Sequence, residues 1–342
     1  MRILNAIHAQ TIGGVDQVFR NYTEVLTQNN HEVALLISAN GNQNYDAKRI
    51  FKLRNLSQIF DVIHLLIVVI RFRPDVIICH SRRLMKWMRF LPLFSSAKSI
   101  AVNHGITFSS SLNCHYVISI NQEIADLVMQ FGFPKERCFV LPNAIKVDQE
   151  YSKKEIKKTP TIGMYGRIEA RKGFDVLIAA AGILAKEGYD FRLKIGGFAV
   201  SEGYDLTHLK TLAKEQGIFE KCDFVGTVYD KKSFFSDVDI FCVPSREEPF
   251  GIVILEGFLF STLVISSNTD GGKFLVGNSE NGLLFENENP SDLADKIKQV
   301  TEKAAPYQQL TKNAFLRLEK DFSFASLARQ FQQILQIISE AK

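Results

Sequence analysis

Residues 161–186 read TIGMYGRIEARKGFDVLIAAAGILAK, and this stretch decides the predicted fold. The apolar run at residues 161–165 predicts a strand, and apolar residues at helical spacing over residues 174–186 predict a helix. A loop with two glycines and several cations joins them. A strand, a loop and a helix in this order form the repeating unit of a parallel sheet covered by helices.

The same alternation of strand and helix patterns runs along the whole chain. In the first half, strands are expected at residues 2–7, 33–38, 75–79, 99–102, 116–120 and 137–141, and helices at 15–26, 56–70 and 123–131, the last capped by Asn121. In the second half, further strands are expected at residues 191–195, 222–225, 239–243 and 263–266, and helices at 206–216, 252–260, 291–303, 307–319 and 324–339. We therefore predict the α/β class, with two doubly wound Rossmann-like domains facing a cleft.

A polar, lysine-rich stretch separates the two halves. Residues 146–160 are expected to be a linker between an N-terminal domain, residues 1–145, and a C-terminal domain, residues 161–342. The last helix, at residues 324–339, could pack back on the first domain. A chain of 342 residues agrees with two domains of roughly 150 residues each.

Composition excludes several protein classes. With 46% hydrophobic and 23% charged residues, the chain is not a disordered protein, a collagen-like fibre or a disulfide scaffold. Its longest apolar stretch, residues 62–70, is shorter than the roughly 20 residues that span a bilayer. No secretory signal is visible, and the five cysteines form no CxxC pair. We therefore expect reduced thiols and a cytoplasmic location.

Positive charge is concentrated in one segment. Residues 48–98 hold eleven Lys and Arg against two acids, a charge of +9 that leaves −5 for the rest of a chain with net charge +4. Such a segment suits nucleic acid, an anionic membrane surface or acidic substrates. Basic residues mixed with Trp, Met and Phe at residues 82–91 suit a helix on a membrane, and equally a core-facing helix with solvated arginines. No nucleic-acid-binding module is evident, so we expect no nucleic acid partner.

Polar residues and glycines fall after the expected strands. In the first half these are His8, His80, Ser81, Asn103, His104, Gly105, Pro142 and Asn143. In the second half they are Gly166, Arg167, Gly196, Gly197, Gly226, Pro244, Ser245 and Arg246. Open parallel sheets bind ligands beyond the carboxyl ends of their strands, so both rows are expected to face one cleft.

Two glycine-containing loops have features of phosphate sites. Gly13 and Gly14 open the first helix and let a backbone approach a phosphate, although an ordinary tight turn also explains them. The GxGxxG fingerprint is absent, which argues against an NAD site. Arg167 and Lys172 flank the start of the helix at residues 174–186, where two cations suit a diphosphate. Solvated cations on a surface loop are the alternative.

The stretch EPFGIVILE, residues 248–256, is the most informative motif. Glu248 lies in a loop, and the following helix carries Glu256 about one turn further, with backbone N–H groups between them. Carboxylates accept hydrogen bonds from sugar hydroxyls, and helix N-terminal N–H groups suit a phosphate. The alternative is that Glu256 is an exposed helical residue.

Three histidines follow expected strands, namely His8, His80 and His104. They could converge on a metal ion, but no short-range ligand pair supports one. A role lining the cleft fits better, and His8 and His80 could instead be satisfied buried histidines.

These residues resemble the retaining glycosyltransferases of family 4, within glycosyl transferases group 1, over essentially the whole length. The matching motifs are Gly13-Gly14, His104-Gly105, the Pro-Asn-Ala-Ile segment with Asn143, the loop with Gly166, Arg167, Lys172 and Gly173, and the E-x7-E pair Glu248 and Glu256. The resemblance implies the GT-B fold, with an acceptor-side first domain and a nucleotide-sugar-binding second domain.

The resemblance also implies the site and the reaction. A hexose-type sugar would pass from a UDP-sugar or GDP-sugar to a glycan acceptor, with retention of configuration and without a metal ion or other cofactor. Arg167 and Lys172 would neutralise the diphosphate, Glu248 would hold sugar hydroxyls, and Glu256 would hold the ribose. Backbone amides of Phe250, Gly251 and Ile252 would contact sugar or phosphate, Gly13 and Gly14 would approach the diphosphate, and His104 would lie beside the reacting sugar.

The acceptor and the competing functions stay open at this stage. We expect a lipid-linked acceptor in lipopolysaccharide, O-antigen or capsule assembly, and a peripheral position on an anionic inner membrane surface through residues 48–98. The alternatives are a soluble glycosyltransferase with a small free acceptor, a non-catalytic sugar-nucleotide binder, and a GT-B-fold epimerase. The family often has glutamate at the last position of Gly-Gly-x-x-Glu, where this chain has Leu275, and this difference motivates the hypothesis of a non-catalytic binder. The intact E-x7-E motif favours a transferase.

Overall fold

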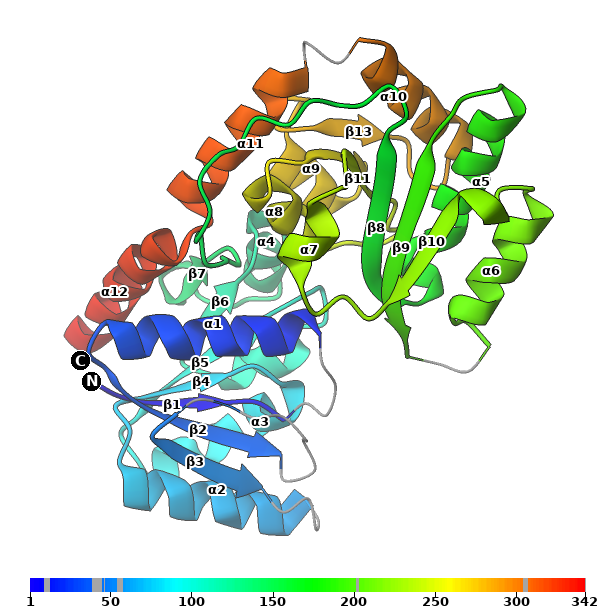
Figure 1. The fold of residues 1–342 in the computed structure, drawn as a ribbon. Helices are drawn as coiled ribbons and strands as arrows, with labels where there is room; N and C mark the ends of the chain where they lie inside the picture. Colours follow the sequence, from blue (N-terminus) through cyan, green and yellow to red (C-terminus); the bar gives the residue numbers. More distant parts are fainter. Residues whose placement is uncertain are drawn as a thin grey trace. The chain divides into compact units, whose positions relative to one another are not determined.

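The computed structural model describes residues 1–8, 13–38, 45, 47–53, 58–200, 203–303 and 307–341. The chain divides into two compact units (Figure 1). The first unit is Met1–Ala144 with Phe322–Lys342, and the second is Ile145–Asp321. The last helix therefore belongs to the first unit, and the stretch expected as a linker belongs to the second.

In its described residues, the first unit holds a seven-stranded sheet of order β3-β2-β1-β4-β5-β6-β7. Every strand pair in it is parallel. The strands are β1 (Arg2–Ala6), β2 (Glu32–Ser38), β3 (Arg49–Leu53), β4 (Val76–Cys79), β5 (Lys98–Asn103), β6 (Tyr116–Ser119) and β7 (Cys138–Val140). The helices are α1 (Gly14–Gln28), α2 (Gln58–Phe72), α3 (Arg82–Trp87), α4 (Gln122–Gln130) and α12 (Phe324–Glu340), with 3-10 turns η1 (Met88–Leu93), η2 (Ser109–Asn113) and η3 (Lys135–Arg137).

The described part of the second unit holds a six-stranded parallel sheet of order β10-β9-β8-β11-β12-β13. Its strands are β8 (Thr161–Ile168), β9 (Arg192–Ala199), β10 (Cys222–Gly226), β11 (Ile240–Val243), β12 (Leu263–Ser267) and β13 (Leu283–Phe285). Its helices are α5 (Phe174–Lys186), α6 (Leu206–Glu215), α7 (Lys231–Phe235), α8 (Ile252–Leu259), α9 (Asp270–Val276), α10 (Pro290–Glu302) and α11 (Tyr307–Asp321), with 3-10 turns η4 (Ala170–Lys172) and η5 (Phe219–Lys221).

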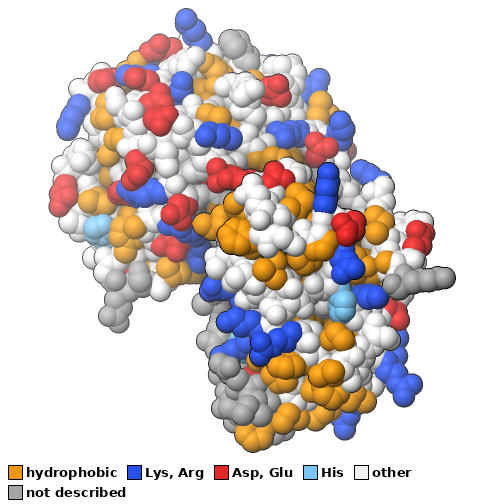
Figure 2. Space-filling view, turned by 180° about the vertical axis from the view of Figure 1, so that it is seen from behind, with side chains coloured by type: hydrophobic (Ala, Val, Ile, Leu, Met, Phe, Trp, Pro, Cys, Tyr) orange, Lys and Arg blue, Asp and Glu red, His pale blue; other side chains and the backbone are white. Residues whose placement is uncertain are grey.

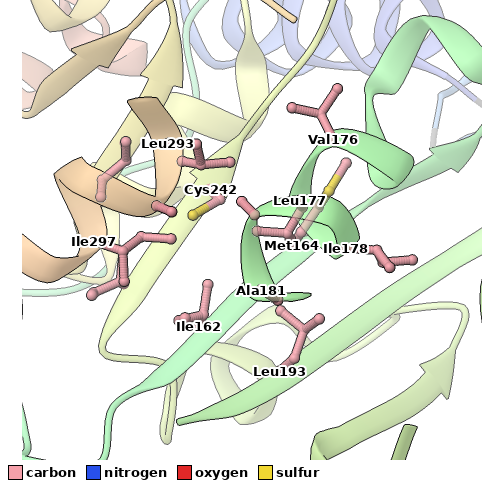
Figure 3. Packing of buried hydrophobic residues seen from close by; sticks show 14 of the residues in the cluster. Ile162, Met164, Val176, Leu177, Ile178, Ala181, Leu193, Cys242, Leu293 and Ile297 are labelled. Atoms are coloured by element: carbon pink, nitrogen blue, oxygen red, sulfur yellow. The ribbon is translucent and has the colours of Figure 1, made fainter. Parts of the chain in front are cut away.

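The expected fold class is confirmed: both units are doubly wound parallel sheets with helices on their faces. The reason is visible in the core of the second unit, where apolar side chains of β8, α5 and α10 interdigitate (Figure 3). The first unit has a core of its own, and α12 packs on α1, where the rings of Tyr22 and Phe331 lie 4.7 Å apart. Asn121 caps α4 as expected, since its Oδ1 accepts from the N–H of Ile124 at 2.9 Å.

The predicted strand ends in the second unit are wrong at two places. β8 and β9 continue to Ile168 and Ala199, so Gly166, Arg167, Gly196 and Gly197 lie inside strands. The two strands stay paired there, and a Cβ on Gly197 would lie 2.4 Å from the carbonyl oxygen of Gly166. Gly197 therefore permits close strand packing, whereas the sequence pattern suggested turns.

Several short elements were absent from the sequence prediction, namely β3, α7, α9 and β13. The stretch expected as a solvated linker also makes specific contacts. Lys154 Nζ donates to the carbonyl oxygen of Phe235 at 2.7 Å and to Thr262 Oγ1 at 2.9 Å, and burial lowers the pKa of this lysine to about 8. Residues 152–157 are thus anchored to the second unit.

The strand orders locate the ligand-binding edge of each sheet. The order reverses between β1 and β4 in the first sheet and between β8 and β11 in the second. The crevice beyond the carboxyl ends of strands at such a reversal is where doubly wound sheets bind ligands. The loops that follow β8 and β11 are therefore the first place to look in the second unit.

Candidate functional site

Two loops meet at the reversal point of the second sheet, one after β8 and one after β11. Gly173 has a φ of +71°, and a Cβ there would lie 1.9 Å from the carbonyl oxygen of Pro244. The N–H of Arg246 donates to the carbonyl oxygen of Arg171 at 2.8 Å. Only glycine fits at position 173 without moving the neighbouring backbone, so the loop geometry depends on this residue.

This packing brings Lys172 and Glu248 together. Lys172 Nζ lies 2.5 Å from Glu248 Oε2, and the two side chains are 16% and 10% exposed. The Glu248 carbonyl oxygen accepts from the N–H of Gly271 at 2.8 Å, which ties the loop to α9. A fixed ammonium group can neutralise an anionic ligand, while the carboxylate oxygens accept hydrogen bonds from hydroxyl groups.

Helix α8 begins in the same loop. Its N-terminal residue Gly251 has a φ of +94°, and no side chain in the described part of the chain caps the helix. The first N–H groups of a helix have no partner within the helix and carry partial positive charge. The backbone from Gly251 to Ile252 is therefore placed to bind an anion near Lys172 and Glu248, whereas the Phe250 side chain is buried.

Glu256 is buried, with 5% of its surface exposed, so the interpretation as an exposed helical residue is wrong. Tyr165 donates its hydroxyl hydrogen to Glu256 Oε2, and Lys231 donates from Nζ to Oε1. Burial and the charge of Glu256 raise the pKa of Tyr165 well above its usual value, so the phenol stays protonated and keeps donating. Glu256 is thus an ionic hydrogen-bond acceptor in a fixed position.

In the described contacts, Arg167 forms an ion pair with Glu169 and does not contact the Lys172–Glu248 pair. It lies inside β8 and its NH2 group is 3.0 Å from Glu169 Oε1, which also takes Arg171 NH2 at 2.8 Å. Arg171 NH1 in turn donates to the carbonyl oxygen of Glu247. The cations of the loop after β8 are therefore arranged by Glu169, and Lys172 alone of them reaches Glu248 in the described contacts.

The Gly271-Gly272 pair has a packing role. A Cβ on Gly271 would lie 2.4 Å from the carbonyl oxygen of Phe250, and one on Gly272 would lie 2.1 Å from that of Ser267. Both glycines let α9 approach the loop that carries Glu248. Leu275, on the same short helix, is fully buried in the core, while Lys273 is exposed.

The remaining predicted residues belong to the first unit. Gly13 precedes α1 in an extended conformation with no atom within 4 Å of its Cβ position, and Gly14 is the first residue of the helix. Helix α1 is fixed to β1 by Asn5, whose amide donates to the Phe19 carbonyl oxygen and to Thr23 Oγ1. No steric reason requires glycine at position 13 among the described residues.

Histidines cluster at the carboxyl ends of β1, β4 and β5. His80 Nδ1 lies 3.2 Å from His104 Nε2 and the two rings are stacked, while His8 Nε2 lies 3.1 Å from Arg83 NH1. Burial lowers the pKa of His104 to about 4 and that of His80 well below its usual range. Both rings are therefore neutral at pH 7. No group of three or more potential metal ligands occurs in the parts of the chain that the structure describes.

Family comparison gives these features a context. Residues 147–317 match the family described as glycosyl transferases group 1. The chain belongs to the glycosyl transferases group 1 family. Residues 12–149 match the family described as Glycosyltransferase Family 4. The match to group 1 covers the loops that carry Lys172 and Glu248, and helix α8 with Glu256.

Relatives of this group 1 member span nearly its full length. The lipopolysaccharide core biosynthesis glycosyltransferase LpsE of Rhizobium meliloti is 23% identical over 337 residues, covering 94% of this chain and 96% of LpsE. The structure of Anabaena HepE in complex with UDP-glucose has a TM-score of 0.83 at 18% identity and 99% coverage of both chains. The lipopolysaccharide outer core galactosyltransferase WaaB, in its apo form, has a TM-score of 0.76 at 15% identity, over 98% of this chain and 99% of WaaB. The two structures establish the likeness of fold.

Sequence reasoning missed three side chains of the candidate site, namely Tyr165, Lys231 and Arg171. Tyr165 was visible only as the last residue of an expected strand. Lys231 lies at the start of α7, which Asp230 caps through a hydrogen bond to the N–H of Ser233. Asp is a favoured N-cap residue, so the start of α7 was open to prediction.

In the described part of the chain, no helix combines the length and the apolar content needed to cross a membrane.

Proposed function

We propose that this chain is a retaining glycosyltransferase of family 4 that moves a hexose-type sugar from a nucleotide-diphospho-sugar to a glycan acceptor. The observation that carries the proposal is the Lys172–Glu248 ion pair beside the uncapped start of α8. It places a cation, helix N–H groups and a carboxylate within one loop cluster. This combination suits a ligand with a diphosphate next to a sugar.

Each predicted residue of the second unit receives a role in donor binding. Lys172, with Arg167, neutralises the diphosphate as its oxygen leaves with the bonding electrons. Glu248 accepts hydrogen bonds from the hydroxyls of the transferred sugar, and Glu256 accepts from the ribose. The amides of Phe250, Gly251 and Ile252 contact phosphate or sugar. The solved complex of HepE with UDP-glucose supports a uridine diphosphate sugar as donor, and a guanosine diphosphate sugar is the alternative.

We propose that no metal ion is needed. The leaving diphosphate gains charge as the bond to the sugar breaks, and lysine, arginine and helix N–H groups stabilise that charge directly. The acceptor hydroxyl forms the new bond on the same face of the sugar and gives its proton to the departing diphosphate oxygen. The configuration at the anomeric carbon is then retained.

The first unit is proposed to supply the acceptor side. His104 lies beside the reacting sugar, and Gly13 and Gly14 approach the diphosphate. Because burial lowers the pKa of His104 to about 4, the imidazole is neutral and serves as a hydrogen-bond partner. His80 Nδ1, 3.2 Å from His104 Nε2, holds the His104 ring in that arrangement.

We propose a lipid-linked acceptor in lipopolysaccharide, O-antigen or capsule assembly, with the protein bound peripherally at the inner face of the membrane. The names of LpsE and WaaB, both assigned to lipopolysaccharide core synthesis, support this acceptor class. The positive charge of residues 48–98 supports an anionic surface as partner.

A thermal-shift panel of UDP-, GDP-, ADP- and CMP-sugars, with and without EDTA, tests the donor site. A ligand at 100 times its Kd adds about 2.7 kcal/mol, which shifts the melting midpoint measurably. One nucleotide should raise the midpoint of the parent protein in EDTA, and the shift should disappear in Glu256→Ala. A flat panel, or a shift that requires a divalent cation, contradicts the proposal. Proton NMR of the first product then reports retention or inversion.

A non-catalytic sugar-nucleotide binder is the second candidate. The observation in its favour is Leu275, which is buried in the core at the position where the resemblance expects glutamate. Such a binder would show the thermal shift without release of nucleoside diphosphate. A coupled assay for nucleoside diphosphate, with and without a lipid extract as acceptor source, separates the two functions.

A further inference from the structure

Helix α2 exposes an apolar face. Its inner row is buried in the core of the first unit and consists of Leu65, Val68, Val69 and Phe72. Its outer row, Phe60, Ile63, Ile67 and Ile70, is 62%, 47%, 43% and 55% exposed. A spacing of three or four residues aligns these side chains in one stripe about 15 Å long. A surface helix of a soluble domain normally carries polar residues on this face.

The apolar surface continues onto η1. Phe90, Leu93 and Phe94 are 38%, 74% and 51% exposed. A pocket of about 620 Å³ joins the two elements, because its lining includes Ile63 from α2 and Phe90 from η1. We call Ile63, Ile67, Ile70, Phe90 and Leu93, with the pocket between α2 and η1, the α2 surface.

Cations border the α2 surface. Lys86 and Arg89 line the pocket, and Arg71 follows Ile70 on the helix. The guanidinium group of Arg89 lies over the Phe90 ring at 4.6 Å. Among the described residues, no acid forms an ion pair with Arg71, Lys86 or Arg89, and all three cations are exposed. Figure 2 shows hydrophobic side chains gathered at the end of the first unit where α2 lies, beside a group of Lys and Arg.

We propose that the α2 surface docks on an anionic lipid bilayer. The Ile and Leu side chains enter the interface, and Lys86 and Arg89 bind lipid phosphates at its edge. An apolar stripe flanked by unpaired cations is the composition of interfacial helices. The charge selects an anionic partner, and the stripe offers apolar groups for a lipid interior rather than hydrogen-bonding groups for an acidic protein.

This proposal places the apolar membrane contact on α2, whereas the sequence pattern suggested residues 82–91. Met85, Trp87 and Met88, which the sequence pattern suggested for a membrane face, are buried in the core of the first unit. The inference rests on the proposed peripheral membrane position and deepens it by naming the surface that makes the contact, whereas the donor site does not enter the argument.

Vesicle sedimentation of the full-length protein tests the docking of the α2 surface. It compares vesicles of phosphatidylcholine alone with vesicles that also contain about 40% phosphatidylglycerol. Binding is expected only to the anionic vesicles. Lys86→Gln/Arg89→Gln should lower the partition coefficient roughly 25-fold, at roughly fivefold for each cation. Ile67→Ser/Ile70→Ser should lower it at least about tenfold. Matched controls are Lys312→Gln/Lys320→Gln and Leu316→Ser/Ile337→Ser, which change similarly exposed residues on α11 and α12.

Three results would overturn the inference. The first is failure of the parent protein to bind anionic vesicles, and the second is equal loss of binding in the variants and their matched controls. The third is a dimer in light scattering that Ile67→Ser/Ile70→Ser converts to a monomer, since a second copy would then cover the face. The nucleotide-sugar thermal shift is measured on every variant without vesicles. It should be unchanged, and its absence in a vesicle-binding parent would contradict the donor site while leaving the docking surface intact.

Discussion

Lys172 and Glu248, 76 residues apart in the chain, form an ion pair of 2.5 Å between the loops that follow β8 and β11. Neither loop holds the pair by itself. Gly173 lets the first loop pack on the backbone of Pro244, and Gly271 lets α9 support the second loop. The arrangement gives the proposed donor site a cation and a carboxylate before any ligand binds.

The ion pair predicts coupled losses of activity. Lys172→Ala and Glu248→Gln should each lower kcat/KM for sugar transfer roughly 100-fold, because each removes a charged group from the donor site. The double variant should lose less than the product of the two, since the side chains act as a pair. Steady-state release of nucleoside diphosphate measures this, with Lys312→Ala on α11 as a control. Strictly multiplicative losses would show that the two residues act separately.

The hydroxyl of Tyr165 is predicted to set the position of Glu256. Tyr165→Phe removes the hydrogen bond to Glu256 Oε2 and keeps the ring in place. Hydrogen bonds to charged groups contribute about 1.5–3 kcal/mol, so affinity for the donor should fall about tenfold or more. Calorimetric titration with the nucleotide sugar measures it. Tyr189→Phe, which removes a surface hydrogen bond to Glu302, should leave the affinity unchanged; equal effects would contradict the role.

The stacked pair of His80 and His104 predicts a loss of stability in weak acid. The pKa of His104 is about 4 in the folded protein and about 6.5 in the unfolded chain, so only the unfolded chain gains a proton between these values. The free energy of unfolding should therefore fall as the pH drops from about 6.5 to about 4, by at most about 3 kcal/mol from His104. His80, whose pKa is also lowered, adds to the loss in the same direction.

Urea unfolding across this pH range measures the effect, and His104→Gln should show a shallower decline than the parent. NMR titration of the imidazole provides a direct check. A His104 ring that titrates near pH 6.5 in the folded protein would rule out the buried neutral pair.

Gly173 and Gly188 give a matched test of loop packing. Both have positive φ, at +71° and +80°, but only Gly173 lacks space for a Cβ. Gly188→Ala should cost about 1 kcal/mol, because it strains the backbone alone. Gly173→Ala should cost several times more and weaken donor binding, since the backbone of Pro244 must move. Urea midpoints compare the two, and similar costs would show that the loop after β11 yields easily.

Local sequence features determined the two-unit α/β fold and the composition of the site. Alternating apolar strands and amphipathic helices act over a few residues, so most elements and the Asn121 cap were predictable. The E-x7-E stretch was predictable for the same reason, because the loop and α8 that it spans are continuous in sequence. These features follow from short-range periodicity and capping.

Only the tertiary structure decided the contacts between distant segments. Strand pairing extended β8 and β9 through Gly166 and Gly197, where the local pattern suggested turns. Glu256 accepts hydrogen bonds from Tyr165 and Lys231, which lie 91 and 25 residues away in the sequence. Helix α2 is apolar all round, so its sequence cannot tell which face is buried; the sheet of the first unit covers one side and leaves Ile63, Ile67 and Ile70 exposed. These contacts could not be predicted because packing against a segment far away in the chain leaves no pattern in the local sequence.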